Sequence, residues 1–152
     1  SFAKMLDALD IGPTEMVLDL GAGLGYSAAV IAHMADFVVA LEENADLAAE
    51  AEARLGAAGV DNVAVLTAPL AQGDAKHGPY DVIVVEGAVE ELPLAIADQL
   101  KDGGRIAAIF ADGNLGTVRI GHKVAGHLHW RFAFNAAAPV LPGFARQRAF
   151  AL

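Results

Sequence analysis

A carboxylate followed by alternating glycines marks the part of this sequence that could bind a ligand. Asp19 lies near the end of the apolar run 16–20, and Gly21, Gly23 and Gly25 follow at alternate positions before a helix-forming run. Glycine permits positive φ and close backbone approach, and a helix N-terminus attracts polar groups of a ligand. A carboxylate at such a turn suits a ligand with an ammonium group better than one with a diphosphate.

The glycine spacing differs from that of dinucleotide-binding folds. Those folds use G-x-G-x-x-G to seat a pyrophosphate on the helix dipole. Here the third glycine comes one residue early, and Tyr26 stands where a small residue is needed. The pattern D-x-G-x-G-x-G resembles instead the S-adenosylmethionine loop of Rossmann-like methyltransferases. A nicotinamide-dependent oxidoreductase and an ordinary glycine-rich turn remain the alternatives.

A second carboxylate follows at the expected distance. Glu42 comes directly after the apolar run 37–41, 17 residues beyond Gly25. A carboxylate at the end of a second strand can accept hydrogen bonds from both hydroxyls of a ribose. Its neighbour Glu43 is more typical of a solvated acid at a helix start, although it lies beside the same predicted site.

Two roles are open for Asp19. Its carboxylate could face the ammonium of a ligand, or it could tie down the glycine loop by accepting backbone N–H bonds. Ser27 could cap the following helix or contact the ligand. The sequence offers Ser27 no plausible His and Asp partners, so a hydrolase triad is not supported.

These residues need a scaffold that brings strand ends together, and the apolar pattern predicts one. Apolar periodicity predicts helices at 2–9, 28–35, 45–55 and 92–100, and strands at 16–20, 37–41, 63–67, 80–85 and 105–110. Strands alternating with helices indicate a mostly parallel sheet. From residue 118 onward, apolar residues alternate around a turn at Gly126, and a last strand is expected at about 146–152. These would be antiparallel strands that complete the sheet at its C-terminal end.

The composition of the chain argues against several classes of partner and binding site. The 152 residues carry a net charge of −9, which argues against nucleic acid as the main partner. The sequence has no cysteine, so thiolate metal sites and disulfides are excluded. No apolar run reaches the roughly 18 residues of a membrane helix, and no signal peptide is visible. We therefore expect a cytoplasmic protein with neither a membrane nor a nucleic-acid partner.

Three histidines lie close together in the sequence. His122, His127 and His129 invite a metal site, but alternation places His127 and His129 opposite Leu128 and Trp130, on the solvent side. We predict no metal.

Four stretches carry a resemblance to a known family. Ala-Lys-Met-Leu (3–6), the glycine loop with its flanks (17–30), Tyr-Asp-Val-Ile-Val-Val (80–85) and Gln-Leu-Lys-Asp-Gly-Gly-Arg-Ile (99–106) resemble the protein-L-isoaspartate O-methyltransferase family. The resemblance implies a Rossmann-like methyltransferase sandwich of the α/β class. It also implies methyl transfer from S-adenosylmethionine to the free carboxylate of isoaspartate in a damaged protein or peptide, which leaves S-adenosylhomocysteine.

The resemblance also implies a set of cofactor contacts. They are expected at Asp19, Gly21, Gly23, Gly25, Tyr26, Ser27, Glu42, Glu43, Ala68 and Glu86. Because a carboxylate nucleophile is already ionised at neutral pH, no catalytic base is needed and none is assigned. Catalysis would then consist of placing the acceptor oxygen in line with the methyl group and excluding water.

The sequence departs from the family pattern in three places. The family carries an N-terminal segment before the stretch at 3–6, so we expect residues 1–152 to be a single cofactor-binding domain without it. Ala68-Pro69 stands where the family has an acid that recognises adenine, and Glu86-Gly87 stands in place of Thr-Ala. A carboxylate at residue 86 would repel a carboxylate substrate unless it is protonated or turned away. A non-catalytic S-adenosylmethionine-binding domain, or a methyltransferase for another small acceptor, is the alternative.

Overall fold

A computed structural model describes residues 2–146 of the chain and gives seven strands and five helical segments. In chain order they are α1 (Phe2–Leu9), β1 (Met16–Leu20), α2 (Tyr26–Ala32), β2 (Phe37–Glu42), α3 (Ala45–Ala57), β3 (Val63–Thr67), the 3₁₀ turn η1 (Leu70–Gln72), β4 (Tyr80–Val89), α4 (Leu94–Asp98), β5 (Leu100–Asp112), β6 (Leu115–Val124) and β7 (His127–Asn135). Of the helices in this range, none has the length and apolar character needed to cross a lipid bilayer.

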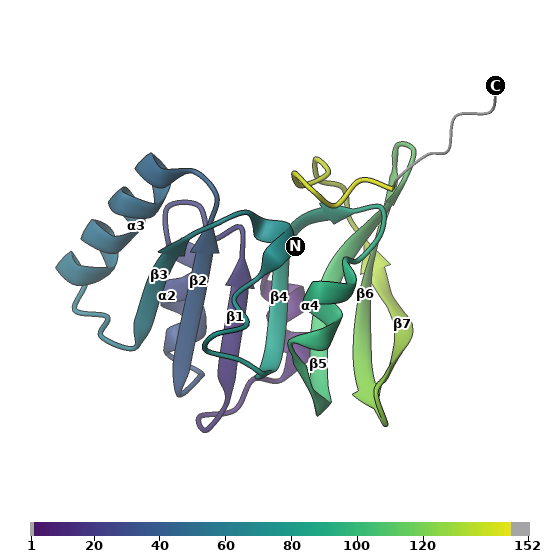
Figure 1. Ribbon diagram of the computed structural model, residues 1–152, viewed down its shortest axis with the longest axis horizontal. Coiled ribbons are helices and arrows are strands. Elements are labelled where there is room, and N and C mark those ends of the chain that lie inside the picture. The colour runs from purple at the N-terminus through teal and green to yellow at the C-terminus, as the bar shows by residue number, and fades with distance from the viewer. Residues whose placement is uncertain (1, 147–152) are drawn as a thin grey trace.

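All seven strands form one sheet in the order β3-β2-β1-β4-β5-β6-β7 (Figure 1). The pairs from β3 to β5 are parallel, and the β5–β6 and β6–β7 pairs are antiparallel. The predicted fold class, a mostly parallel α/β sheet with antiparallel strands at its C-terminal end, is therefore confirmed. Strand order reverses between β1 and β4, and ligands of open α/β sheets bind at such a reversal, outside the carboxyl ends of the strands.

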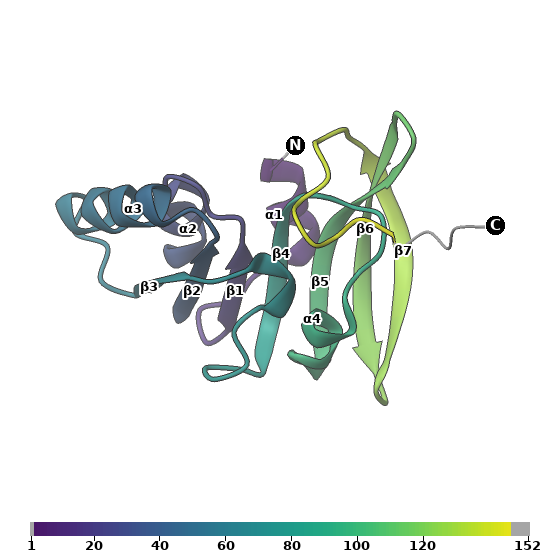
Figure 2. The same cartoon turned by 45° about the horizontal axis from the view of Figure 1, so that its top comes forward.

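The sheet is covered on both faces. Figure 2 shows α1, α2 and α3 along one face and α4 on the other. Alternate residues of each central strand enter the two cores: Val17 packs with Ile31 on the α2 side, whereas Leu18 packs with Ile96 on the α4 side. This explains why the central strands are continuously apolar rather than alternating in polarity.

Two predicted helices have different bounds in the structure. Helix α2 begins at Tyr26 and ends at Ala32, earlier at both ends than the predicted 28–35. Helix α3 continues through Gly56 to Ala57 and does not stop at that glycine. A Cβ at Gly56 would meet nothing within 4 Å, and the left-handed backbone occurs later, at Gly59 (φ +74°).

The region around 92–104 differs most from the prediction. Helix α4 spans only five residues, because the carbonyl of Gln99 accepts the backbone N–H of Tyr80 (2.7 Å) and the chain is already extended at Leu100. Gly103 and Gly104 lie within β5 and do not separate it from the helix. A Cβ at Gly104 would lie 2.9 Å from the carbonyl oxygen of Asp81, so this glycine allows the two backbones to approach.

The C-terminal part contains the expected hairpin of β6 and β7, with left-handed residues at Ala125 and Gly126. A register shift at Val118/Arg119 leaves Phe132 exposed, while Phe134 packs with the α1-side core. The strand predicted at about 146–152 lies outside the described residues, apart from the irregular Arg146.

Residues 136–144, here called the strap, run from β7 back across the sheet to the end of β4. The N–H of Ala88 donates to the carbonyl of Pro139 (3.1 Å), and the N–H of Leu141 donates to the carbonyl of Ala88 (2.9 Å). Strand β4 therefore extends beyond the predicted end at Val85, with a bulge between Val84 and Ala88. Phe144 anchors the strap because its side chain is fully buried.

Candidate functional site

The glycine loop connects β1 to α2 in a left-handed conformation. Gly21, Gly23 and Gly25 have φ values of +83°, +57° and +91°. The N–H groups of Gly21 and Ala22 both donate to the carbonyl of Leu41, at 2.9 and 3.2 Å, which ties the loop to the end of β2. The loop therefore lies at the carboxyl end of β1, where the strand order reverses.

Glu42 joins the glycine loop to α3. Its side chain is 8% exposed; Oε1 accepts the N–H of Gly23 (2.9 Å), and Oε2 accepts the N–H of Asn44 (2.8 Å). Asn44, a residue type that is common at helix N-caps, caps α3, since its Oδ1 accepts the N–H groups of Asp46 and Leu47. The carboxylate that ties down the loop is thus Glu42, a role that the sequence had left open for Asp19.

A cleft of about 480 Å³ lies at the carboxyl ends of β1 and β2. It is lined by Gly21, Glu42, Glu43, Asn44, Leu70, Leu141 and Pro142. One wall comes from the end of β2, a second from η1, and a third from the strap.

Two buried carboxyl groups lie beside the glycine loop. Asp19 is fully buried, and its Oδ2 accepts a hydrogen bond from the Ser27 hydroxyl (2.7 Å). Asp19 Oδ1 and Glu86 Oε2 are buried and have no hydrogen-bond partner among the described residues. Burial first, and then the neighbouring Glu86 carboxylate, raises the pKa of Asp19 well above its usual range. Two buried acceptors without a donor fit a ligand that brings N–H groups and positive charge.

The structure shows which way Glu86 points. The carbonyl oxygen and Cβ of Glu86 lie 3.6 and 3.8 Å from the Cβ position of Gly21, so this residue packs directly on the glycine loop. Because its Oε2 is buried next to Asp19, that oxygen is turned inward from the rim where the sequence placed it. A separate pocket of about 250 Å³, lined mainly by apolar residues of α1, β5 and the strap, also reaches Glu86.

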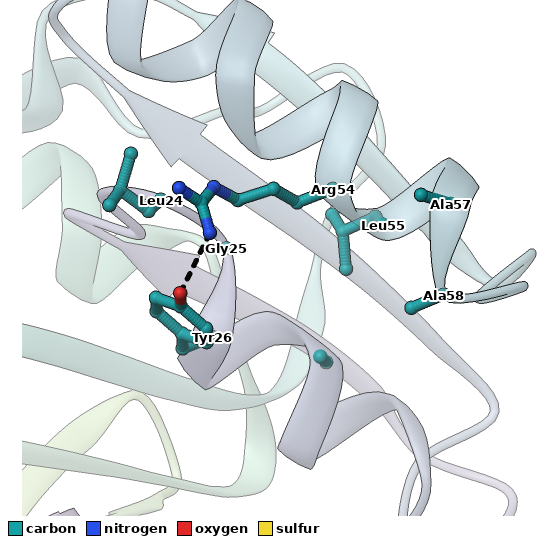
Figure 3. A pocket seen from close by; sticks show the side chains of 8 residues that line it. Leu24, Gly25, Tyr26, Arg54, Leu55, Ala57 and Ala58 are labelled. Atoms are coloured by element: carbon teal, nitrogen blue, oxygen red, sulfur yellow. Dashed lines mark hydrogen bonds between the residues drawn. The ribbon is translucent and has the colours of Figure 1, made fainter.

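The other predicted contacts lie in different places. Glu43 is exposed on the cleft wall, and the N–H of Ala68 donates to the carbonyl of Glu42 (3.3 Å). Tyr26 is 65% exposed and lies outside the cleft, in a groove of about 390 Å³ between α2 and α3. Its hydroxyl accepts a hydrogen bond from Arg54 Nη1 at 2.8 Å (Figure 3). Asp19, Ser27 and Glu86 thus gather beside the glycine loop, whereas Tyr26 does not.

Sequence reasoning did not assign four of the residues that line the cleft, namely Asn44, Leu70, Leu141 and Pro142. Leu70 lies between the predicted strands at 63–67 and 80–85, and Leu141 and Pro142 lie between the predicted hairpin and the strand expected at about 146–152. The Pro142-Gly143 pair signalled a turn, but nothing in the local pattern placed that turn over the end of β4.

The two histidines of β7 are exposed, as alternation predicted. Within residues 2–146, no three His, Asp or Glu side chains gather into a group that could hold a metal ion.

The family model and the curated relatives that match this chain name the same family. Residues 1–123 match the model of the protein-L-isoaspartate(D-aspartate) O-methyltransferase family. A protein-L-isoaspartate O-methyltransferase of Koribacter versatilis is 38% identical over 83% of this chain and 57% of its own length. One of Azorhizobium caulinodans is 40% identical over 70% of this chain and 49% of its own length. The chain thus spans about half the length of these curated relatives.

Solved structures show the same fold. A protein-L-isoaspartate O-methyltransferase superposes with a TM-score of 0.87 at 24% identity, covering 93% of this chain and 46% of its own. A Plasmodium falciparum structure in complex with S-adenosyl-L-homocysteine gives a TM-score of 0.77 at 20% identity, covering 92% and 72%. At these identities the likeness supports the fold alone.

Proposed function

Because the chain belongs to the protein-L-isoaspartate O-methyltransferase family, we propose that residues 1–152 form a single S-adenosylmethionine-binding domain of a carboxyl O-methyltransferase that repairs isoaspartyl proteins. The observation that carries the proposal is the pair of buried, unpartnered carboxyl oxygens on Asp19 and Glu86 beside the glycine loop. A cleft of about 480 Å³ next to the loop supports it.

The chain's residues have separate roles in this proposal. Asp19 and Glu86 hold the amino group of the methionine part, and Glu42 at the end of β2 receives the ribose hydroxyls. The backbone of the glycine loop contacts the methionine part. S-adenosylmethionine, when bound, supplies an activated methyl group on a sulfonium. The protein contributes position and exclusion of water, since an acceptor carboxylate is ionised at neutral pH.

A second candidate function rests on two departures from the family pattern. Pro69 stands in place of an acid and cannot donate a backbone N–H, and Glu86 brings a carboxylate to the site. Both changes are compatible with cofactor binding and less so with an anionic acceptor. This candidate is a cofactor-binding domain without isoaspartate activity, or a methyltransferase for another small acceptor.

We expect Glu42→Ala to weaken binding of S-adenosylhomocysteine by about 1–3 kcal/mol, because the ribose hydroxyls and the N–H groups of Gly23 and Asn44 lose their acceptor. Isothermal titration calorimetry measures the effect. Glu52→Ala is the matched control: this acid is exposed on α3 and does not line the cleft, so its loss should change the affinity little. Equal affinity of the Glu42 variant and the unmodified protein would contradict the ribose role.

The function itself is tested in two steps. Titration with S-adenosylhomocysteine and with NAD establishes the cofactor class, and tighter binding of NAD would remove the methyltransferase proposal. Transfer of a labelled methyl group to an isoaspartyl peptide, compared with the matched aspartyl peptide, then tests the acceptor. Cofactor binding without transfer to either peptide would favour the second candidate.

A further inference from the structure

Two elements that are distant in sequence bring the carboxyl groups of Asp19 and Glu86 together. Asp19 lies on β1 and Glu86 on the bulge of the parallel neighbour β4, where strand order reverses. With both carboxyls ionised, each group has one buried oxygen without a donor among residues 2–146, and a hydrogen bond between the two groups forms only when Asp19 keeps a proton. Leaving a buried acceptor unpaired is costly, so such a pair indicates that a donor belongs there.

No charged group of the protein balances this pair in the described part of the chain. The hydroxyl of Ser27, from α2, donates to Asp19 Oδ2, and Glu86, from β4, is the ionisable neighbour that acts on Asp19. No salt bridge to either residue is formed among residues 2–146. Burial and the adjacent Glu86 carboxylate disfavour the charged form of Asp19, so the pKa of Asp19 is raised and this group keeps its proton to a higher pH than a solvated aspartate does.

Glu42 provides a useful contrast. It is nearly as buried as Asp19, but both of its oxygens accept backbone N–H groups from Gly23 and Asn44. The carboxylate of Glu42 therefore has donors within the fold, whereas the ionised forms of Asp19 and Glu86 leave one oxygen each without a donor among residues 2–146.

We propose that Glu86 acts with Asp19 as a two-carboxylate seat for a single ammonium group, and that this seat releases a proton when the ammonium of the cofactor enters. The proposal rests on the proposed function, because it names the amino group of S-adenosylmethionine as the cation. The exchange balances: the seat loses one proton to solvent and gains one positive charge from the ligand. Glu86 is thus a specificity-determining residue that favours ligands with a free amino group.

The seat predicts a pH dependence of affinity. Where Asp19 holds its proton, each ligand molecule displaces up to one proton, so affinity rises by up to about tenfold per pH unit and levels off once Asp19 is ionised. The raised pKa of Asp19 agrees in direction with this behaviour. A ligand without an amino group gains nothing from the ionised pair and should lack this rise.

The experiment is calorimetry of the full chain with S-adenosylhomocysteine in two buffers of different ionisation enthalpy, at pH values from 6 to 9. We expect proton release with S-adenosylhomocysteine and none with 5′-methylthioadenosine, which lacks the amino-acid part. Glu86→Gln should reduce the proton release and make the affinity less dependent on pH. It should also weaken the binding of S-adenosylhomocysteine about tenfold or more. Glu52→Gln, an exposed acid of α3, is the matched control and should behave as the unmodified protein.

The outcomes separate the two proposals. Tight binding of S-adenosylhomocysteine without proton release, or with a Glu86→Gln affinity equal to that of the unmodified protein, would overturn the seat and leave the proposed function standing. Absence of any S-adenosylhomocysteine binding by the unmodified protein would overturn both. If the Gln variant does not fold, the unmodified protein still tests the proposal. Only the two-carboxylate seat predicts that S-adenosylhomocysteine releases more protons on binding than 5′-methylthioadenosine does.

Discussion

Replacing Arg105 by methionine is expected to lower the free energy of unfolding by about 2–4 kcal/mol. The guanidinium donates to both carboxylate oxygens of Glu15, at 2.7 and 2.6 Å, and to the carbonyl oxygens of Leu9 and Asp10, at 2.6 and 2.7 Å. It thereby joins β5 to the C-terminal end of α1 and to the turn before β1. Methionine fills similar space but leaves these partly buried acceptors without a donor.

Urea unfolding at neutral pH measures this loss, and Arg54→Met is the matched control. Arg54 also pairs with a glutamate, Glu50, at 2.8 Å and donates to the Tyr26 hydroxyl, but these contacts are solvent-exposed, so its replacement should cost at most about 1 kcal/mol. Equal stability of the Arg105 variant and the unmodified protein would show that the pair does not hold α1 in place.

The Arg105–Glu15 pair also predicts that the free energy of unfolding depends on pH. Arg105 first, through its hydrogen bonds, lowers the pKa of Glu15 below the usual value of 4.5. A carboxyl group whose pKa is lowered on folding contributes stability that is present above its unfolded pKa and is lost as pH falls through the folded value. The stability difference between the unmodified protein and Arg105→Met should therefore shrink on acidification below about pH 4.5. A difference that is the same at pH 3 and pH 7 would contradict the assignment.

The second large effect is expected at the last glycine of the loop. Gly25 has φ +91°, and a Cβ there would lie 3.2 Å from the Cβ of Ala51 on α3. Gly25→Ala combines the left-handed backbone cost of about 1–2 kcal/mol with a steric contact that displaces α3. We expect a loss of about 2–4 kcal/mol in the free energy of unfolding, together with a loss of S-adenosylhomocysteine affinity of at least tenfold.

Gly59→Ala isolates the backbone contribution to that effect. Gly59 has φ +74°, but nothing lies within 4 Å of its Cβ position, and it is remote from the cleft. Its substitution should cost only the backbone contribution of about 1–2 kcal/mol and leave cofactor affinity unchanged. If the two variants lose equal stability, the contact with Ala51 contributes nothing.

Much of the fold followed from local pattern. The continuous apolar strands, the glycine loop and the Asn44 cap each carry a signal within a few residues, and the structure confirms them. The short length of α4 could not be predicted from local pattern. Its end is fixed by the backbone hydrogen bond between Tyr80 and Gln99, which lie 19 residues apart. The strap was missed for the same reason: its partners are on β4, and its sequence shows only a turn.

For the candidate site, too, part could be predicted from the sequence and part could not. The positions of Asp19 and Glu42 at strand ends follow from the spacing of glycines and apolar runs. Their roles do not: the glycine loop is tied by Glu42, whereas Asp19 has an unpartnered oxygen beside Glu86. Which carboxylate receives backbone donors depends on how β1, β2 and β4 lie side by side. That arrangement is tertiary, and no periodicity encodes it.

The position of the strap also determines when the cleft is completed during synthesis of the chain. Leu141 and Pro142 complete a cleft whose first lining residue is Gly21, so the binding surface joins segments that are far apart in the sequence. During vectorial synthesis the N-terminal strands leave the ribosome first. A nascent chain that stops short of the strap therefore lacks one wall of the cleft. A ligand that contacts all three walls can therefore stabilise only a chain that has been synthesised as far as the strap.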